Sequence, residues 1–115
     1  LLAKRYNEAL MGIHKSIRCQ VIPHKVYSAR HLYAVRVPKS KRCKLIQELV
    51  NNGISTNIHY RPVHLQPYYH NLGFKNGDFP EAEIHGETVF SLPLFPDLPS
   101  QAQTKVVRVI RKVLT

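Results

Sequence analysis

The densest group of residues that could do chemistry lies between residues 57 and 70. This segment of 14 residues holds three histidines, three tyrosines and one arginine, and two prolines interrupt it. An arginine beside imidazoles can bind a phosphate or a carboxylate, and a tyrosine can stack on a ring. The alternative is a packed loop in which Tyr60, Leu65 and Tyr68 lie on the core. The residues alone leave a binding loop and a packed loop equally open.

The same segment does not have the pattern of a metal site. His59 and His64 are five residues apart across a proline, whereas a helical zinc pair has a spacing of four, and no cysteine or acid lies nearby. Cys43 lies in a run of cations that would favour a thiolate, but no Cys/His/Asp arrangement accompanies it. Phosphate-loop, dinucleotide and GxSxG motifs are missing as well. We therefore expect no metal ligand, no catalytic residue and no cofactor-binding residue in the chain.

Length and charge narrow the class of protein. The chain has 115 residues, enough for one domain, and its 17 lysines and arginines against 7 acids give a net charge of +10. A basic domain attracts phosphates, but RNP aromatics, a GXXG loop and a paired Cys/His finger are missing. A nucleic-acid partner is therefore not our expectation, although a basic nucleic-acid-binding module stays open as an alternative. We expect no membrane partner, and two cysteines suit a reduced, cytoplasmic protein.

The elements that must position the candidate residues follow from hydrophobic periodicity. Spacing predicts helices over residues 1–12, 40–51, 78–87 and 100–114, and strands over 17–22, 31–37, 54–60 and 89–92. Ser40, Asp78 and Ser100 are the expected helix caps. The first helix begins without a cap, so we interpret it as the end of a longer helix. This order predicts an α/β fold, a two-layer sandwich of a small sheet with helices on one face.

Several separated stretches resemble one family. They are SARHLYAVRV (28–37), GISTNIHYRPVHLQPYY (53–69), FPEAE (79–83) and SLPLFPDL (91–98). In order and spacing they resemble the C-terminal part of the nucleotide-sugar aminotransferases of the DegT/DnrJ/StrS family. The resemblance covers essentially the whole chain.

That resemblance implies a domain plan and a site. The fold would be the C-terminal small domain of the fold-type I transferases that depend on pyridoxal phosphate (PLP), with a mostly antiparallel sheet. Residues 1–14 would end the interdomain helix, residues 15–115 would form the small domain, and the large PLP-binding domain would lie outside these residues. The implied substrate-binding residues, on the sugar-nucleotide side of the active site, are Ile58, His59, Tyr60, Arg61 and, close behind them, His64.

The resemblance also implies a reaction for the full-length protein. It would move an amino group, usually from glutamate, to a nucleotide-linked keto sugar, as in polysaccharide biosynthesis. Family members are homodimers, and the resemblance implies the same here. PLP would be held by the large domain, so the residues of this chain are expected to bind none and to be inactive alone. A non-catalytic relative of the family is the remaining alternative.

Overall fold

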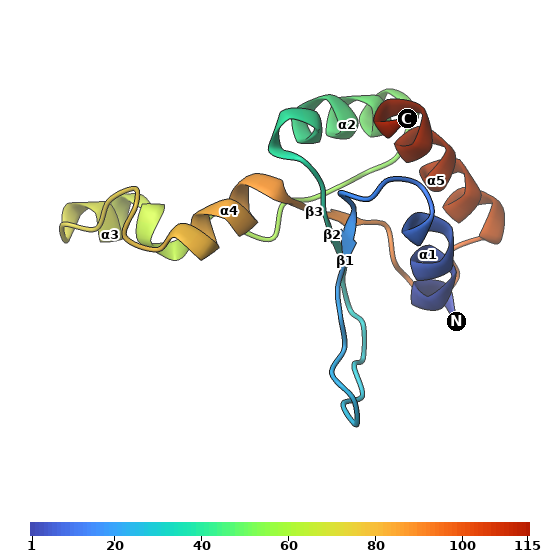
Figure 1. Cartoon of the computed structure of the whole chain (residues 1–115), viewed down its shortest axis with the longest axis horizontal. Helices are drawn as coiled ribbons and strands as arrows, with labels where there is room; N and C mark the ends of the chain where they lie inside the picture. Colours follow the sequence, from blue (N-terminus) through green and yellow to red (C-terminus); the bar gives the residue numbers. More distant parts are fainter.

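The computed structural model describes residues 1–115 and shows a small α/β domain with a three-stranded antiparallel sheet (Figure 1). Its elements are α1 (Leu2–Met11), β1 (Arg18–Cys19), β2 (Tyr33–Arg36), α2 (Lys39–Asn51), the 3₁₀ turn η1 (Val63–Leu65), α3 (Pro67–Asn71), α4 (Pro80–Thr88), β3 (Val89–Leu92) and α5 (Ser100–Leu114). The predicted fold class is confirmed. None of these helices is both long and apolar enough to cross a membrane.

The sheet places β2 between the two other strands. β1 pairs with β2, and β2 pairs with β3 in a register that sets Val35 opposite Phe90 and Ala34 opposite Ser91. In β2, Tyr33 and Val35 are buried and their neighbours are half-buried, as the alternating pattern predicts. All four residues of β3 are buried, so this strand is the best-covered part of the sheet.

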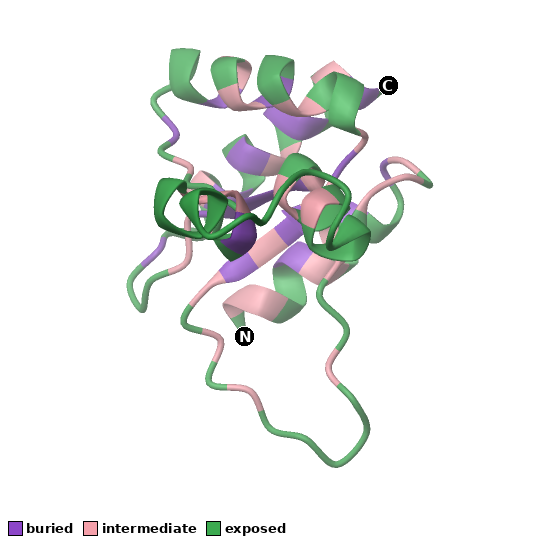
Figure 2. Ribbon diagram, turned by 90° about the vertical axis from the view of Figure 1, so that its left-hand side faces the viewer, coloured by how far each residue is buried: buried purple, intermediate pink, exposed green.

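Helices α1, α2 and α5 form the second layer. α5 contacts both of the others, and its Val106 and Ile110 join Leu45 and Leu49 of α2 in one core (Figure 2). α1 contributes Tyr6, whose hydroxyl donates a hydrogen bond of 3.1 Å to the Pro93 carbonyl. Burial raises the pKa of Tyr6 to about 12. The core therefore ties the first helix to the segment that follows β3.

Two segments project from this body (Figures 1 and 2). One is the loop of residues 20–32 between β1 and β2. The other, which we call the arm (residues 61–85), contains η1, α3 and most of α4, and His64 is its single buried residue. The radius of gyration is 15.4 Å, against about 13 Å for a compact chain of 100 residues. The arm carries Arg61 and His64, and the other three predicted substrate-binding residues, Ile58, His59 and Tyr60, immediately precede it.

The strand predicted over residues 54–60 is wrong. This segment meets the free edge of β3 at one position, where Asn57 lies opposite Ser91. In this antiparallel register His59 would lie opposite Val89. The Val89 amide instead donates to the His85 carbonyl, and the Val89 carbonyl accepts from Arg42, so the pairing with β3 does not continue. Ile54 is buried as expected, but Ile58 is 38% exposed and Tyr60 is 71% exposed.

The expected helix caps are also wrong, although the helices themselves are confirmed. Pro38, Phe79 and Pro99 occupy the N-cap positions, and no side chain caps these helices. Asp78 instead accepts a hydrogen bond from the Lys75 amide, within the loop before α4. A side chain caps a helix only if the backbone at that position is not yet helical, and in α2 and α5 the serines already lie inside the first turn.

Candidate functional site

His59 lies beside the sheet because the segment that carries it is fastened to β3. The Asn57 carbonyl accepts a hydrogen bond of 2.7 Å from the Ser91 amide, and the Asn57 amide donates to the Ser91 carbonyl over 3.4 Å. Two residues later, Nδ1 of His59 lies 2.9 Å from Oγ of Ser91. These contacts hold the imidazole at the edge of the sheet.

The imidazole lines a cavity of about 280 Å³, which we call the His59 cavity. Asn57, Ser91, His31 and Phe95 also line it. His59 is half-buried, and Nε2 makes no hydrogen bond within the chain. The ring of Tyr60 stands edge-on to the imidazole at a centroid distance of 4.8 Å. The cavity thus offers a polar ring nitrogen, an amide and an aromatic face to a ligand.

Arg61 belongs to a different cavity, of about 530 Å³, which we call the Arg61 cavity. Ile58 and Arg61 line it together with Arg42 and with Glu83 and Glu87. His59 is not part of this lining, so Ile58 and His59 face different cavities. Arg61 is exposed and makes no hydrogen bond or ion pair within the chain, so its guanidinium is free to bind an anion.

His64 occupies the base of the arm. It is 6% exposed, its Nε2 lies 2.8 Å from Oε1 of Glu83, and its ring stands edge-on to Phe79. The same carboxylate oxygen accepts hydrogen bonds from the amides of Gly77 and Phe79. The hydrogen bond from His64, followed by that from Gly77, lowers the pKa of Glu83 below its ordinary value. Glu83 is therefore the polar centre that holds the loop before α4 in place.

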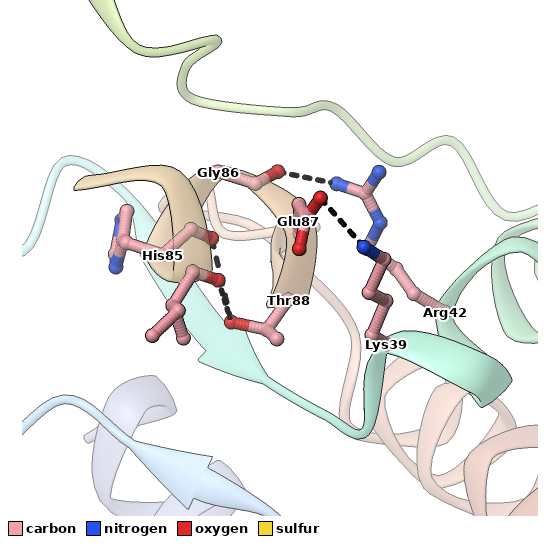
Figure 3. A network of polar contacts seen from close by, with 7 residues as sticks. Lys39, Arg42, His85, Gly86, Glu87 and Thr88 are labelled. Atoms are coloured by element: carbon pink, nitrogen blue, oxygen red, sulfur yellow. Dashed lines mark hydrogen bonds and ion pairs between the residues drawn. The ribbon is translucent and has the colours of Figure 1, made fainter. Parts of the chain in front are cut away.

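Gly86 and Glu87, which follow the arm directly, are bound to α2 (Figure 3). Arg42 donates a hydrogen bond of 2.8 Å to the Gly86 carbonyl, and Lys39 forms an ion pair of 2.7 Å with Glu87. A Cβ atom on Gly86 would lie 2.6 Å from Cδ of Pro62, so only glycine lets the two ends of the arm cross this closely.

The five predicted substrate-binding residues thus separate into three environments. His59 lines the His59 cavity, and Tyr60 contacts its ring without lining that cavity. Ile58 and Arg61 line the Arg61 cavity, and His64 lies inside the arm. The packed-loop alternative is wrong for Tyr60 and Tyr68, which are 71% and 69% exposed. Sequence reasoning missed Ser91, because a lone serine in an apolar stretch carries no signal of a histidine partner 32 positions away.

We expect Glu83→Ala to loosen the arm. The variant removes the acceptor for the Gly77 and Phe79 amides, so these amides should exchange with deuterium about tenfold faster or more. In the wild type, the protection should be full above the ordinary pKa of a glutamate and should be lost as the pH falls through the lowered pKa of Glu83. The variant should lack this acid-dependent step.

Glu81→Ala is the matched control, because Glu81 is an exposed acid in the same helical turn with no hydrogen bond in the structure. Hydrogen exchange read by mass spectrometry or NMR measures both variants. Equal protection of the Gly77 and Phe79 amides in the two variants would contradict the role of Glu83.

Comparison with known proteins supports the resemblance in sequence and in structure. A model of the DegT/DnrJ/EryC1/StrS aminotransferase family matches residues 1–111. An uncharacterized protein of Methanocaldococcus jannaschii is 35% identical over 99% of this chain, which spans 31% of that protein. DesV of S. venezuelae, solved in complex with a ketimine intermediate, superposes with a TM-score of 0.88 at 33% identity, over 96% of this chain and 29% of DesV.

A further solved structure gives the same result. Spr1654 of Streptococcus pneumoniae, in its PLP form, matches with a TM-score of 0.86 at 34% identity, over 99% of this chain and 31% of that chain. The chain therefore spans less than a third of the length of these relatives. With a family match over nearly all of its residues and a sugar-aminotransferase fold, the chain belongs to the DegT/DnrJ/EryC1/StrS aminotransferase family.

Proposed function

We propose that the chain is the small domain of a PLP-dependent sugar aminotransferase. In this proposal residues 1–14 end the helix that joins the two domains, and residues 15–115 form the small domain. The observation that carries the proposal is the His59 cavity, which places a half-buried imidazole with a free nitrogen at the edge of a family-typical fold. The full-length protein would be a cytoplasmic homodimer that transfers an amino group from glutamate to a nucleotide-linked keto sugar.

In that protein the two cavities would share the substrate. His59, with Tyr60 beside it, would contact the sugar, because a half-buried imidazole can hydrogen-bond one oxygen at close range. Arg61, with Ile58 against the same cavity, would bind the diphosphate, because an exposed guanidinium suits phosphate oxygens. His64 would act through the arm by keeping its base rigid. Movement of the whole domain would close the cleft over the substrate.

PLP requires a different set of residues from those in these cavities. When bound, the cofactor supplies the carbonyl and the electron sink for amino transfer, and it needs a lysine amine next to a phosphate cradle. Neither the His59 cavity nor the Arg61 cavity has a lysine in its lining. The residues present do not fit covalent PLP binding, so we assign PLP to the large domain of the proposed protein.

We expect the 115-residue chain to form no stoichiometric PLP adduct. The two cavities that hold the site residues have no lysine in their linings, so the lysines of the chain should give only weak imines spread over several side chains. Absorbance after adding PLP, followed by borohydride reduction and peptide mapping, measures this. A single lysine labelled at one equivalent would contradict the small-domain proposal. The control is a protein of equal net charge and unrelated fold, such as a basic helical bundle. It measures how much PLP labels lysines without selectivity.

A further inference from the structure

Ser91 has a buried hydroxyl with one partner. The residue is 5% exposed on β3, and its backbone amide and carbonyl are both bonded to Asn57. Its Oγ makes one hydrogen bond in the structure, to Nδ1 of His59 at 2.9 Å. The sheet and Asn57 thus fix the backbone of Ser91, and the hydrogen bond to His59 orients its hydroxyl group.

The count of hydrogen atoms between the two groups decides the direction of this bond. A neutral imidazole carries its hydrogen on either Nδ1 or Nε2. If Nδ1 carried it, Nδ1 would donate to Oγ, and the hydroxyl hydrogen of Ser91, which is 5% exposed, would have no acceptor within the chain. If Nε2 carries it, Ser91 donates to Nδ1, and the hydrogen without a partner in the chain is the one on the half-buried imidazole that lines the His59 cavity. Buried donors without acceptors are rare because they cost the free energy of desolvation.

We propose that Ser91 is a positioning residue that holds His59 in the Nε2–H tautomer. Nε2 has no partner within the chain, and the imidazole lines the His59 cavity. His59 therefore presents a hydrogen-bond donor to whatever occupies that cavity. The edge contact with Tyr60 restricts rotation of the imidazole in addition.

A donor in this place selects an acceptor on the ligand. The matching groups are oxygens of a phosphate, a carboxylate, a carbonyl or a sugar hydroxyl. Combined with the proposed function, on which this step rests, His59 would bind an oxygen atom of the nucleotide sugar and would not remove a proton from it while the ring is neutral. The other titratable group that lines the cavity is His31, and it makes no hydrogen bond with its side chain.

The tautomer can be read directly from ¹⁵N-labelled histidine in the 115-residue chain. Long-range ¹H–¹⁵N spectra, recorded at a pH where the rings are neutral, distinguish a bare nitrogen from a protonated one. For Nδ1 of His59 we expect the ¹⁵N chemical shift of a nitrogen without a hydrogen. For Nε2 we expect the shift of a nitrogen that carries one. His59→Gln assigns the signals by removing them. His64, which pairs with Glu83 away from the His59 cavity, is the internal reference.

Two variants test the role of Ser91. Ser91→Ala should move the two nitrogen shifts of His59 toward each other, as the two tautomers exchange, and should leave those of His64 unchanged. Ser91→Thr keeps the hydroxyl and should retain the wild-type pattern. A protonated-type Nδ1 in the wild type would overturn the proposal, and so would an unchanged His59 pattern in a folded Ser91→Ala chain.

The wild-type spectrum alone decides the tautomer even if Ser91→Ala does not fold. No ligand is present in this experiment, so its outcome is independent of the proposed function. Titration with dTDP-glucose as a probe tests the function separately. If the wild-type chain has the Nε2–H tautomer of His59 but does not bind dTDP-glucose, the result contradicts the proposed sugar aminotransferase function. It does not contradict the role of Ser91.

Discussion

His59→Ala should lower kcat/KM for a nucleotide-linked keto sugar by about 10- to 100-fold in the full-length aminotransferase that we propose. The loss corresponds to one hydrogen bond from a half-buried imidazole to a polar or charged group on the substrate. PLP absorbance should persist, because the proposed large domain holds the cofactor. Steady-state kinetics together with the absorbance spectrum of the purified protein measure both effects.

His70→Ala is the matched control for this experiment. His70 is an exposed histidine on α3 whose side chain makes no hydrogen bond, so its removal should change kcat/KM less than twofold. If His59→Ala lost its PLP absorbance, the histidine would belong to the cofactor site. If it kept wild-type kinetics, the His59 cavity would have no role in the reaction.

Phe90→Ala should destabilise the chain by about 3–5 kcal/mol. Phe90 is fully buried on β3 opposite Val35, and its removal leaves a cavity between the sheet and the helices. A domain of this size has a total free energy of unfolding of about 5–15 kcal/mol, so the variant should lose a large part of its stability. Urea denaturation followed by circular dichroism measures the change.

Tyr27→Ala serves as the comparison for Phe90→Ala. Tyr27 is an aromatic residue that is 96% exposed in the projecting loop, and its removal should cost less than about 0.5 kcal/mol. Similar urea midpoints for the two variants would show that β3 is not the centre of the core. That outcome would also weaken the assignment of Ser91, whose position depends on the same strand.

Much of the fold was predictable because local pattern and packing agree in it. The spacing of Val106, Ile110 and Leu114 predicts the buried face of α5, and the structure shows that face buried. The alternation of Tyr33 and Val35 likewise predicts β2. In these elements the residues that determine the periodicity are the residues that form the core.

The segment of residues 54–79 behaves differently because its structure depends on distant partners. Alternation over residues 54–60 predicts a strand, but only Asn57 pairs with β3. The backbone groups of Val89 that would face His59 are bonded to His85 and Arg42. The short helices η1 and α3 have no buried residue apart from His64, so the sequence has no hydrophobic periodicity that would predict them. Glu83 binds η1 through His64 and the loop before α4 through the amides of Gly77 and Phe79, and all three of these partners are distant in sequence or lie outside the helix.

The candidate site was predictable in its residue types and not in its arrangement. A dense group of histidine, tyrosine and arginine identifies the segment, and the resemblance selects five residues within it. Their distribution over two cavities and the arm arises where the chain leaves the sheet after Asn57. The hydroxyl of Ser91 on β3 contacts His59 across 32 positions of sequence, so only the three-dimensional structure identifies it as a partner.

A titration of the ¹⁵N-labelled chain with dTDP-glucose, followed by amide NMR spectra, tests whether the His59 and Arg61 cavities form a substrate site. We expect saturable shift changes at Asn57, His59 and Arg61 and at Ser91, with binding weakened at least tenfold in His59→Gln/Arg61→Gln. The double variant Lys15→Gln/His70→Gln also replaces one histidine and one cation, lies away from both cavities and should bind like the wild type. Saturable changes confined to α2 and α5, or equal weakening in both double variants, would contradict a substrate site at the His59 and Arg61 cavities.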